Sequence, residues 1–220
     1  MGMPSLVVLI SGNGSNLQAI IDACDDKTIK ANISAVISNR PDAGGLKRAG
    51  KSNIPALCLD HTQFSDRESF DTALVKMIEQ YQPDLVVLAG FMRILSPSFI
   101  QRFSDRILNI HPSLLPKFPG LNTHARAIKA NENQHGCSVH FVTEALDGGP
   151  LIAFSELDIN PTDTPDSLAQ RILTIEHNLY PKVIALFVEK RLYMKGASIE
   201  LDGKTLTSPV KIIENGPDSK

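Results

Sequence analysis

The chain has 220 residues, of which 42% are hydrophobic and 21% are charged, and its formal net charge is −2 at pH 7. This composition is typical of a globular protein with a sizeable core, and it gives no basic field for nucleic acid or for an acidic membrane. No hydrophobic run is long enough to cross a bilayer, and the first residues show no cleavable leader pattern. The widely spaced Cys24, Cys58 and Cys137 suit a reducing compartment and argue against a disulfide framework or a structural zinc site. We therefore expect a cytoplasmic globular protein with no nucleic-acid or membrane partner.

Short hydrophobic runs alternate with amphipathic segments through the first half of the chain. Such runs are typical of strands buried on both faces of a parallel sheet, and the helical periodicity between them predicts βαβ units with right-handed crossovers. We expect strands at residues 5–10, 32–38, 55–59 and 85–89. We expect one helix capped by Ser15 or Asn16, followed by helices at residues 46–50 and 65–81.

The second half of the chain predicts a different arrangement. A short helix at residues 98–103 leads into a strand at 106–111, and Thr123 is the expected cap of a helix at 123–130. Strands at 137–142 and 151–159 form a hairpin-like pair. A long amphipathic helix spans 164–188 with a kink near Pro181, and a small hairpin and a frayed tail follow. The fold class is therefore α/β, a single-domain, open and mostly parallel twisted sheet flanked by helices, with a Rossmann-like N-terminal half and an antiparallel extension near the C-terminus.

The loop after the first predicted strand reads Gly12-Asn13-Gly14-Ser15-Asn16. Small residues let backbone N–H groups approach an anion, and the N-terminus of the following helix adds a favourable partial charge. The loop lacks the Gly-Lys-Ser/Thr ending of a Walker A motif, and it lacks the third glycine of a dinucleotide fingerprint. It therefore favours a single phosphate, as in a mononucleotide-like substrate. A tight βα turn that uses glycine only for its geometry explains the same residues nearly as well.

A second group of polar residues follows the strand predicted at 106–111. Asn109 and His111 are two residues apart, so a strand that persists through His111 places both on one face, at the edge where open α/β sheets bind ligands. Asp147, in a Leu-Asp-Gly-Gly-Pro loop, is the carboxylate that could join them. An amide and a protonated imidazole can stabilise the oxyanion of an acyl-type transfer, and a carboxylate favours the charged ring. A satisfied polar histidine and an ordinary turn aspartate are the alternatives.

Four segments together resemble the phosphoribosylglycinamide formyltransferases, the folate-dependent enzymes of purine synthesis. They are SGNGSNLQAIIDA, LAGFMRILS, NIHPSLLPKFPG and HFVTEALDGGP, in that order along the chain. The pattern Asn-x-His-Pro-Ser-Leu-Leu-Pro alone is shared with other users of 10-formyltetrahydrofolate, which include methionyl-tRNA formyltransferase and formyltetrahydrofolate deformylase. The glycine loop narrows the match, and the resemblance weakens only after about Lys190.

The resemblance implies a role for each matching residue. Asn109, His111 and Asp147 match the catalytic trio. The substrate would be held by Gly14, Ser15, Asn16, Leu173, Thr174, Ile175 and Glu176. The folate pocket would be formed by Asn109 and Asp147 with Arg67, Met92, Arg93, Ile94, Leu95, Thr143, Glu144, Ala145 and Leu146. The alternatives are core packing for residues 92–95 and a solvated helix face for Glu176. For His140, near the end of a predicted strand, a structural role is at least as well supported as a catalytic one.

No internal repeat and no clear interdomain linker occurs in the sequence, so we expect one domain over residues 1–220. The resemblance implies a phosphate- and substrate-binding half at 1–104 and a catalytic and folate-binding half at 105–190, followed by a hairpin and tail at 191–220. It implies formyl transfer from 10-formyltetrahydrofolate, a cosubstrate and not a tightly bound cofactor, to the amine of glycinamide ribonucleotide, with no metal, by a monomer or homodimer. Because no Gly-x-Ser-x-Gly nucleophile motif occurs, direct amine attack is expected. Hydrolysis of the same folate and a non-catalytic mononucleotide sensor are the rivals, and transfer to methionyl-tRNA is disfavoured without an appended basic domain.

Overall fold

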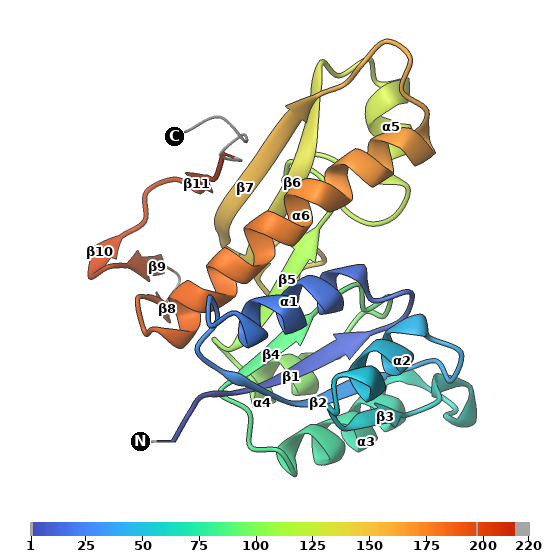
Figure 1. Ribbon diagram of the computed structural model, residues 1–220, viewed down its shortest axis with the longest axis vertical. Helices are drawn as coiled ribbons and strands as arrows, with labels where there is room; N and C mark the ends of the chain where they lie inside the picture. The colour runs from blue at the N-terminus through green and yellow to red at the C-terminus, as the bar shows by residue number, and fades with distance from the viewer. Residues whose placement is uncertain (1, 197, 214–220) are drawn as a thin grey trace.

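The computed structural model describes residues 2–196 and 198–213. In this part of the chain, eight strands form the main sheet in the order β11-β7-β6-β5-β4-β1-β2-β3, and a small sheet in the order β10-β9-β8 lies towards the C-terminal end (Figure 1). From β3 to β5 neighbouring strands are parallel, whereas β6 is antiparallel to both β5 and β7. The predicted fold class is confirmed, and the division of the domain into halves stays a prediction.

The predicted strands are all present. They are β1 (Ser5–Ile10), β2 (Asn32–Ser38), β3 (Ala56–Cys58), β4 (Leu85–Leu88), β5 (Ile107–His111), β6 (Gln134–Phe141) and β7 (Leu151–Asp158). The expected C-terminal hairpin is formed by β8 (Leu192–Lys195) and β9 (Ser198–Leu201), with β10 (Lys204–Thr205) beside it. One strand was not predicted, because it is only two residues long: β11 (Val210–Lys211) pairs parallel with β7. The tail prediction for residues 214–220 lies outside the described residues.

The helices are α1 (Ser15–Asp25), α2 (Gly44–Lys51), α3 (Arg67–Glu79), α4 (Pro97–Arg102), α5 (Thr123–Lys129) and α6 (Pro165–Val188), and a 3-10 turn, η1, spans His61–Gln63. Two predicted caps are wrong. The N-cap of α1 is Gly14 with φ 76°, not Ser15 or Asn16. The N-cap of α5 is Asn122 with φ 57°, not Thr123. Both helices start from a left-handed residue, a conformation that glycine and asparagine adopt more readily than serine or threonine.

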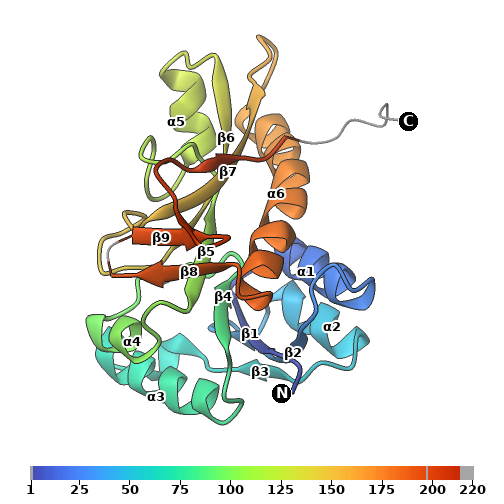
Figure 2. The same cartoon turned by 90° about the vertical axis from the view of Figure 1, so that its left-hand side faces the viewer.

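The sheet buries a separate core on each of its faces, and Figure 2 shows the helices on its two sides. Alternation along β1 sends Leu6, Val8 and Ile10 into the core beneath α1 and α6, and Val7 and Leu9 into the core beneath α3 and α4. β1 is therefore buried on both faces, which is why its sequence is almost continuously hydrophobic.

The long helix α6 is fixed at both ends of its path over the sheet. Thr164 caps it in a capping box with Ser167, and the helix continues through Pro181, so the kink predicted there stays a prediction. The hydroxyl of the fully buried Tyr180 lies 3.0 Å from the Leu88 carbonyl oxygen and 2.9 Å from that of Leu108. α6 is therefore held against the last residue of β4 and the beginning of β5. None of the helices in the described ranges combines the length and hydrophobicity needed to cross a membrane.

Candidate active site

Two polar side chains project from the carboxyl end of β5. The strand persists through His111 as predicted, so Asn109 and His111 share one face while Leu108 and Ile110 enter the core on the other. The antiparallel register with β6 places His140 directly opposite Asn109. Side chains at such opposite positions are close enough to interact.

The imidazole of His140 orients the Asn109 amide. Nδ1 of His140 lies 2.8 Å from the carbonyl oxygen of Phe141, which can only accept, so Nδ1 carries the hydrogen. Burial lowers the pKa of His140 and keeps the ring neutral, which leaves Nε2 as an acceptor. Nε2 lies 3.1 Å from Asn109 Nδ2 and accepts one of its hydrogens. The second amide hydrogen of Asn109 is not used in this bond, so it is the one that could be donated to a ligand at the edge of the sheet.

The structure brings His111 and Asp147 together. Nδ1 of His111 lies 3.5 Å from Asp147 Oδ2, and the two side chains are only 8% and 11% exposed. Asp147 Oδ2 also accepts the backbone N–H of Gly120 at 2.8 Å. On the other side of the ring, Nε2 of His111 donates to the Phe118 carbonyl oxygen at 3.0 Å. The predicted imidazole and carboxylate therefore meet, Asn109 lies on the same face of β5 as His111, and the loop of residues 117–120 contacts the imidazole through the Phe118 carbonyl.

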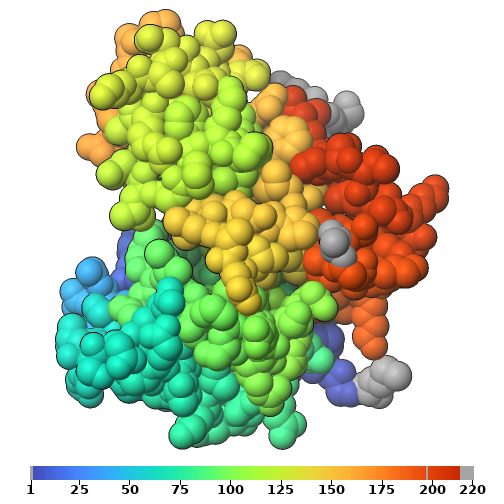
Figure 3. Space-filling model, turned by 180° about the vertical axis from the view of Figure 1, so that it is seen from behind, coloured from blue at the N-terminus to red at the C-terminus, as the bar shows by residue number. Residues whose placement is uncertain are grey.

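The loop that carries Asp147 reaches the site because of a glycine. A Cβ added to Gly149 would lie 1.8 Å from the Phe141 carbonyl oxygen, so no larger residue fits there without displacing backbone. Asp147 itself has φ 48°, so it is a turn residue as well as the neighbour of His111. Figure 3 shows the part of the chain around this loop, in yellow, at the surface between the green and the red segments.

The glycine loop presents an uncapped helix end. Gly14 has no side chain to cap α1, and a Cβ there would lie 2.7 Å from the Cα of Gly45. The N–H of Gly45 donates to the Gly12 carbonyl oxygen at 3.1 Å, and Arg48 Nε donates to that of Asn13 at 2.8 Å. The glycines thus serve the tight turn and also leave the first-turn N–H groups of α1 without a side-chain cap, which is an arrangement that binds anions.

Asn16 and Glu176, which are predicted to hold the substrate, are in direct contact. Asn16 Nδ2 donates to Glu176 Oε2 at 2.6 Å, and Asn16 Oδ1 is buried without a hydrogen-bond partner among the residues that the structure describes. Burial raises the pKa of Glu176 from 4.5 to about 7, and the bond from Asn16 only partly offsets this effect. The alternative of a solvated helix face for Glu176 is wrong, because this residue is 4% exposed. An orphaned acceptor beside a buried carboxyl is suited to the hydroxyl and amide hydrogens of a polar ligand.

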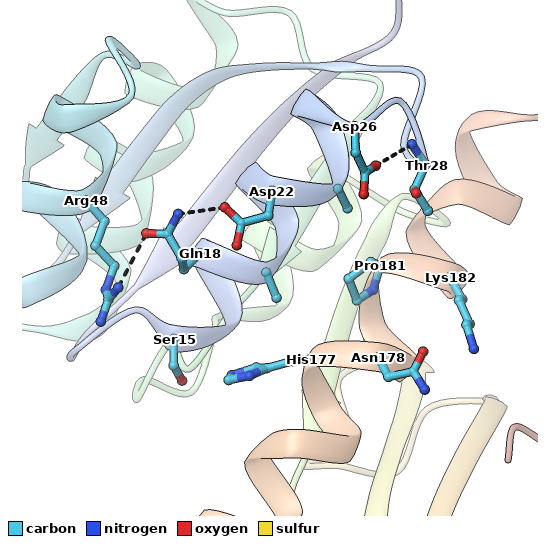
Figure 4. Close-up of a pocket in the computed structure, with 12 residues that line it drawn as sticks. Ser15, Gln18, Asp22, Asp26, Thr28, Arg48, His177, Asn178, Pro181 and Lys182 are labelled. Carbon is cyan, nitrogen blue, oxygen red and sulfur yellow. Dashed lines mark hydrogen bonds between the residues drawn. The ribbon is translucent and has the colours of Figure 1, made fainter. Parts of the chain in front are cut away.

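A hollow of about 630 Å³ lies between α1 and α6 beside the glycine loop (Figure 4). Its lining includes Ser15, Arg48 and His177, and none of the three residues Asn109, His111 and Asp147. The imidazole of His177 extends towards Ser15, and its buried Nε2 has no hydrogen-bond partner within residues 2–196 and 198–213. Burial lowers the pKa of His177. The hollow is therefore an outer neighbour of the glycine loop and is separate from the trio.

The loop after β4 divides into exposed and buried side chains. Met92 and Ile94 are 67% and 56% exposed, so the core-packing alternative is wrong for them. Leu95 is buried in the core beneath α3 and α4, and the guanidinium of Arg93 lies 4.5 Å from the centre of the Phe70 ring. The loop therefore offers apolar side chains and backbone groups to a ligand, while Arg93 turns inward.

The remaining predicted residues are more scattered. Arg67 begins α3 and pairs with Glu68 at 3.0 Å. Leu146 is 55% exposed, and its loop also holds Thr143, Glu144 and Ala145 at the surface. Within α6, Leu173 is half-buried, whereas Thr174 and Ile175 line a different hollow beside β7 and β11. The structure does not bring the side chains of Thr174 and Ile175 to the contact between Asn16 and Glu176.

Three buried polar residues beside these loops were missed by the sequence reasoning. Ser11 and Asn39 follow the ends of β1 and β2, and Asp71 lies within α3. Each is at most 5% exposed. A serine or asparagine directly after a buried strand is the signal that could have indicated the first two. Asp71 carries no such signal, because a charged residue within an amphipathic helix is normally solvated. Among the described residues, no three His, Cys, Asp or Glu side chains gather as a metal site would require.

Comparison with known proteins gives this arrangement a class. The family model described as "Formyl transferase" matches residues 5–184, which are most of the chain. Together with the fold and the site, this match defines a formyl-transferring enzyme.

Individual relatives narrow the class. Phosphoribosylglycinamide formyltransferase of Escherichia coli K12 is 51% identical over 202 residues, which are 92% of this chain and 95% of that protein. The solved structure of phosphoribosylglycinamide formyltransferase from Coxiella burnetii has a TM-score of 0.91 at 50% identity and covers 96% of this chain and 100% of its own. The human trifunctional purine biosynthetic protein adenosine-3 is 41% identical over 181 residues, which are 18% of that protein. The chain belongs to the phosphoribosylglycinamide formyltransferases of the formyl transferase family.

Proposed function

We propose that the chain transfers the formyl group of 10-formyltetrahydrofolate to the amine of glycinamide ribonucleotide, as a step of purine biosynthesis. The observation that carries this proposal is the contact of His111 with Asp147, with Asn109 on the same face of β5, at the sheet edge that also carries the uncapped N-terminus of α1, which suits a phosphate. Family membership supports the choice of donor and acceptor. We take both as small-molecule substrates of a cytoplasmic monomer or homodimer, with no tightly bound cofactor.

Attack of the amine on the formyl carbon forms a tetrahedral intermediate whose oxygen becomes negative. Donors placed at such an oxygen typically lower the barrier by about 3 to 4 kcal/mol. The free amide hydrogen of Asn109, oriented by His140, is one such donor. The Nε2–H of His111 is the other. In this structure that hydrogen points at the Phe118 carbonyl. Binding of 10-formyltetrahydrofolate must therefore displace the carbonyl and move the loop of residues 117–120.

Asp147 has two tasks in this mechanism. Its carboxylate faces Nδ1 of His111 and stabilises the charged ring while the oxyanion exists. It then helps the proton of the attacking amine to reach the departing folate nitrogen, through a water molecule. No side chain forms a covalent intermediate, so the formyl group passes directly from donor to acceptor.

The substrate-binding residues are assigned on the same geometry. The N-terminus of α1 at Gly14, Ser15 and Asn16 takes the phosphate. Glu176 and the orphaned Oδ1 of Asn16 take hydrogens of the ribose and the glycinamide. The exposed Met92 and Ile94 offer an adaptable apolar surface for the flat pterin, and the remaining predicted residues of both pockets stay proposals.

The proposal is tested by mixing the purified chain with both substrates and following the absorbance of the folate product. Turnover should require glycinamide ribonucleotide and should yield its formylated form in equal amount. Formate release at the same rate without glycinamide ribonucleotide would instead indicate a deformylase. Tight binding of a phosphate ligand without any formyl transfer would indicate a sensor.

A further inference from the structure

Ser11 lies between the two loops that the proposed function uses, and it contacts both sides. It follows β1 directly and precedes the glycine loop of residues 12–16. Its backbone N–H donates to the Gly90 carbonyl oxygen at 3.1 Å, and its hydroxyl oxygen accepts the backbone N–H of Met92 at 2.8 Å. Ser11 is 5% exposed, so water competes little for these bonds.

Asn39 determines which way the Ser11 hydroxyl points. The hydroxyl donates to Asn39 Oδ1 at 2.5 Å, and Asn39 is 3% exposed. A hydroxyl has one hydrogen and two lone pairs, so donation to Asn39 directs a lone pair at Met92. Hydrogen bonds in such a chain strengthen one another, because each donor is polarised by the bond that it accepts. The ends of β1, β2 and β4 are thus tied together by one buried relay.

The far end of the loop after β4 is held separately. The N–H of Ser96 donates to Asp71 Oδ2 at 2.5 Å, and Asp71 is fully buried. The inward-facing Arg93 adds an attractive charge to Asp71. With this end fixed by α3, the position of Met92 depends on the Ser11 hydroxyl at the near end.

We propose that Ser11 is a positioning residue for the folate: its hydroxyl, held by Asn39, fixes the backbone of Met92 and so pre-forms the surface that the pterin meets. This inference rests on the proposed function, because it takes residues 92–95 as part of the folate pocket. Without the hydroxyl, Met92 N–H loses its partner and the loop samples other arrangements. The folate must then select or re-form the binding arrangement of the loop. Its apparent affinity falls in proportion to the fraction of time that the loop spends in that arrangement.

The test compares Ser11→Ala with Ser34→Ala. Ser34 is a matched control because its hydroxyl also makes a hydrogen bond, to Ser5 at 2.7 Å. This bond lies near the beginning of β1 and β2, whereas Ser11 follows the last residue of β1, so the two serines lie at opposite ends of the strands. Ser11→Ala should raise the KM for 10-formyltetrahydrofolate about tenfold and leave kcat and the KM for glycinamide ribonucleotide within about twofold, because its backbone bond to Gly90 is kept. Ser34→Ala should change none of the three constants. Ser11→Thr, which keeps the hydroxyl, should recover most of the loss.

An unchanged folate KM in Ser11→Ala, or an equal rise of both KM values, would overturn the positioning role. If Ser11→Ala does not fold, Asn39→Ala replaces it, and a folate KM raised about threefold supports the inference while an unchanged value refutes it. Absence of formyl transfer by the wild-type chain is a different result. It would remove the proposed function itself. Calorimetric titration of the wild type and Ser11→Ala with 10-formyltetrahydrofolate would then test whether the Ser11 hydroxyl supports folate binding, and equal affinities of the two proteins would refute that role.

Discussion

The buried carboxyl of Glu176 should make the stability of the protein depend on pH in a predictable way. Burial raises its pKa from 4.5 to about 7, so between these values the folded chain keeps a proton that the unfolded chain has lost. Unfolding then releases this proton, and the free energy of unfolding falls as the pH rises through that window. A difference of this size corresponds to about 3 kcal/mol once Glu176 is fully ionised, because one pH unit is worth about 1.4 kcal/mol.

Replacing Glu176 with Gln removes the titrating group and keeps its size and its ability to accept the bond from Asn16. Urea unfolding of both proteins at pH 5 and at pH 8 measures the effect. Relative to the wild type, Glu176→Gln should gain about 2 to 3 kcal/mol between pH 5 and pH 8, since part of the window already lies below pH 5. Glu68→Gln is the control, because the side chain of Glu68 is 63% exposed and its replacement removes no buried charge.

The reasoning would be refuted by a difference between wild type and Glu176→Gln that stays constant within about 0.5 kcal/mol across this range, a resolution that denaturant extrapolation allows for well-matched variants. Such a result would mean that Glu176 is solvated in the folded protein. A loss of the pH dependence in Glu68→Gln as well would assign it to the surface charge as a whole.

Three further predictions concern the site itself. His111→Ala should lower kcat at least about a hundredfold with little change in either KM, as expected for a donor that acts in the transition state, and near-normal kcat in a folded variant would contradict the proposed mechanism. His140→Ala should lower kcat about tenfold, because the amide of Asn109 is no longer oriented. His140→Gln should lose less, because its amide oxygen can accept the same bond. Equal kcat values for the two variants would argue that His140 does not orient Asn109. Gly149→Ala should destabilise the fold by about 1 to 3 kcal/mol and lower kcat, because the new Cβ meets the Phe141 carbonyl; thermal melts and steady-state rates measure both, and an unaffected enzyme would show that the Asp147 loop tolerates displacement.

The sequence predicted the central fold well for a physical reason. Strands β1 and β4 are buried on both faces, so each appears as a hydrophobic run between polar or glycine-rich segments. β2 and β5 are largely buried as well, although polar residues interrupt their hydrophobic runs. The spacing of Asn109 and His111 was informative for a similar reason, because a two-residue period leaves no choice of face once the strand is known. The contact with Asp147 was proposed from its Leu-Asp-Gly-Gly-Pro loop, with an ordinary turn aspartate as the alternative, and the resemblance favoured it. A contact between a strand and a loop some 36 positions away depends on the close approach at Gly149, which no local pattern encodes.

What the sequence did not predict has physical reasons too. Serine, threonine, asparagine and glycine are all common N-cap residues, so the sequence alone did not decide between neighbours. Gly14 and Asn122 take the N-cap position because the chain enters each helix with positive φ, and that angle depends on where the preceding loop comes from. The buried state of Glu176 is set by the packing of α6 against α1, and His140 acquires its contact with Asn109 only through the register of β5 and β6. These are tertiary effects, and residue spacing within a single element carries no information on them.

The short strand β11 has a consequence for handling the protein. It covers the outer side of β7 with two parallel residues, and the bond from Ser155 Oγ to the Ile212 carbonyl and the ion pair of Lys211 with Glu156 hold it there. A chain cut before Val210 would leave a row of unsatisfied peptide groups along β7, ready to recruit the same strand of another molecule. Shortened versions of this protein should therefore be prone to self-association and precipitation, even though Asn109, His111 and Asp147 would all still be in place.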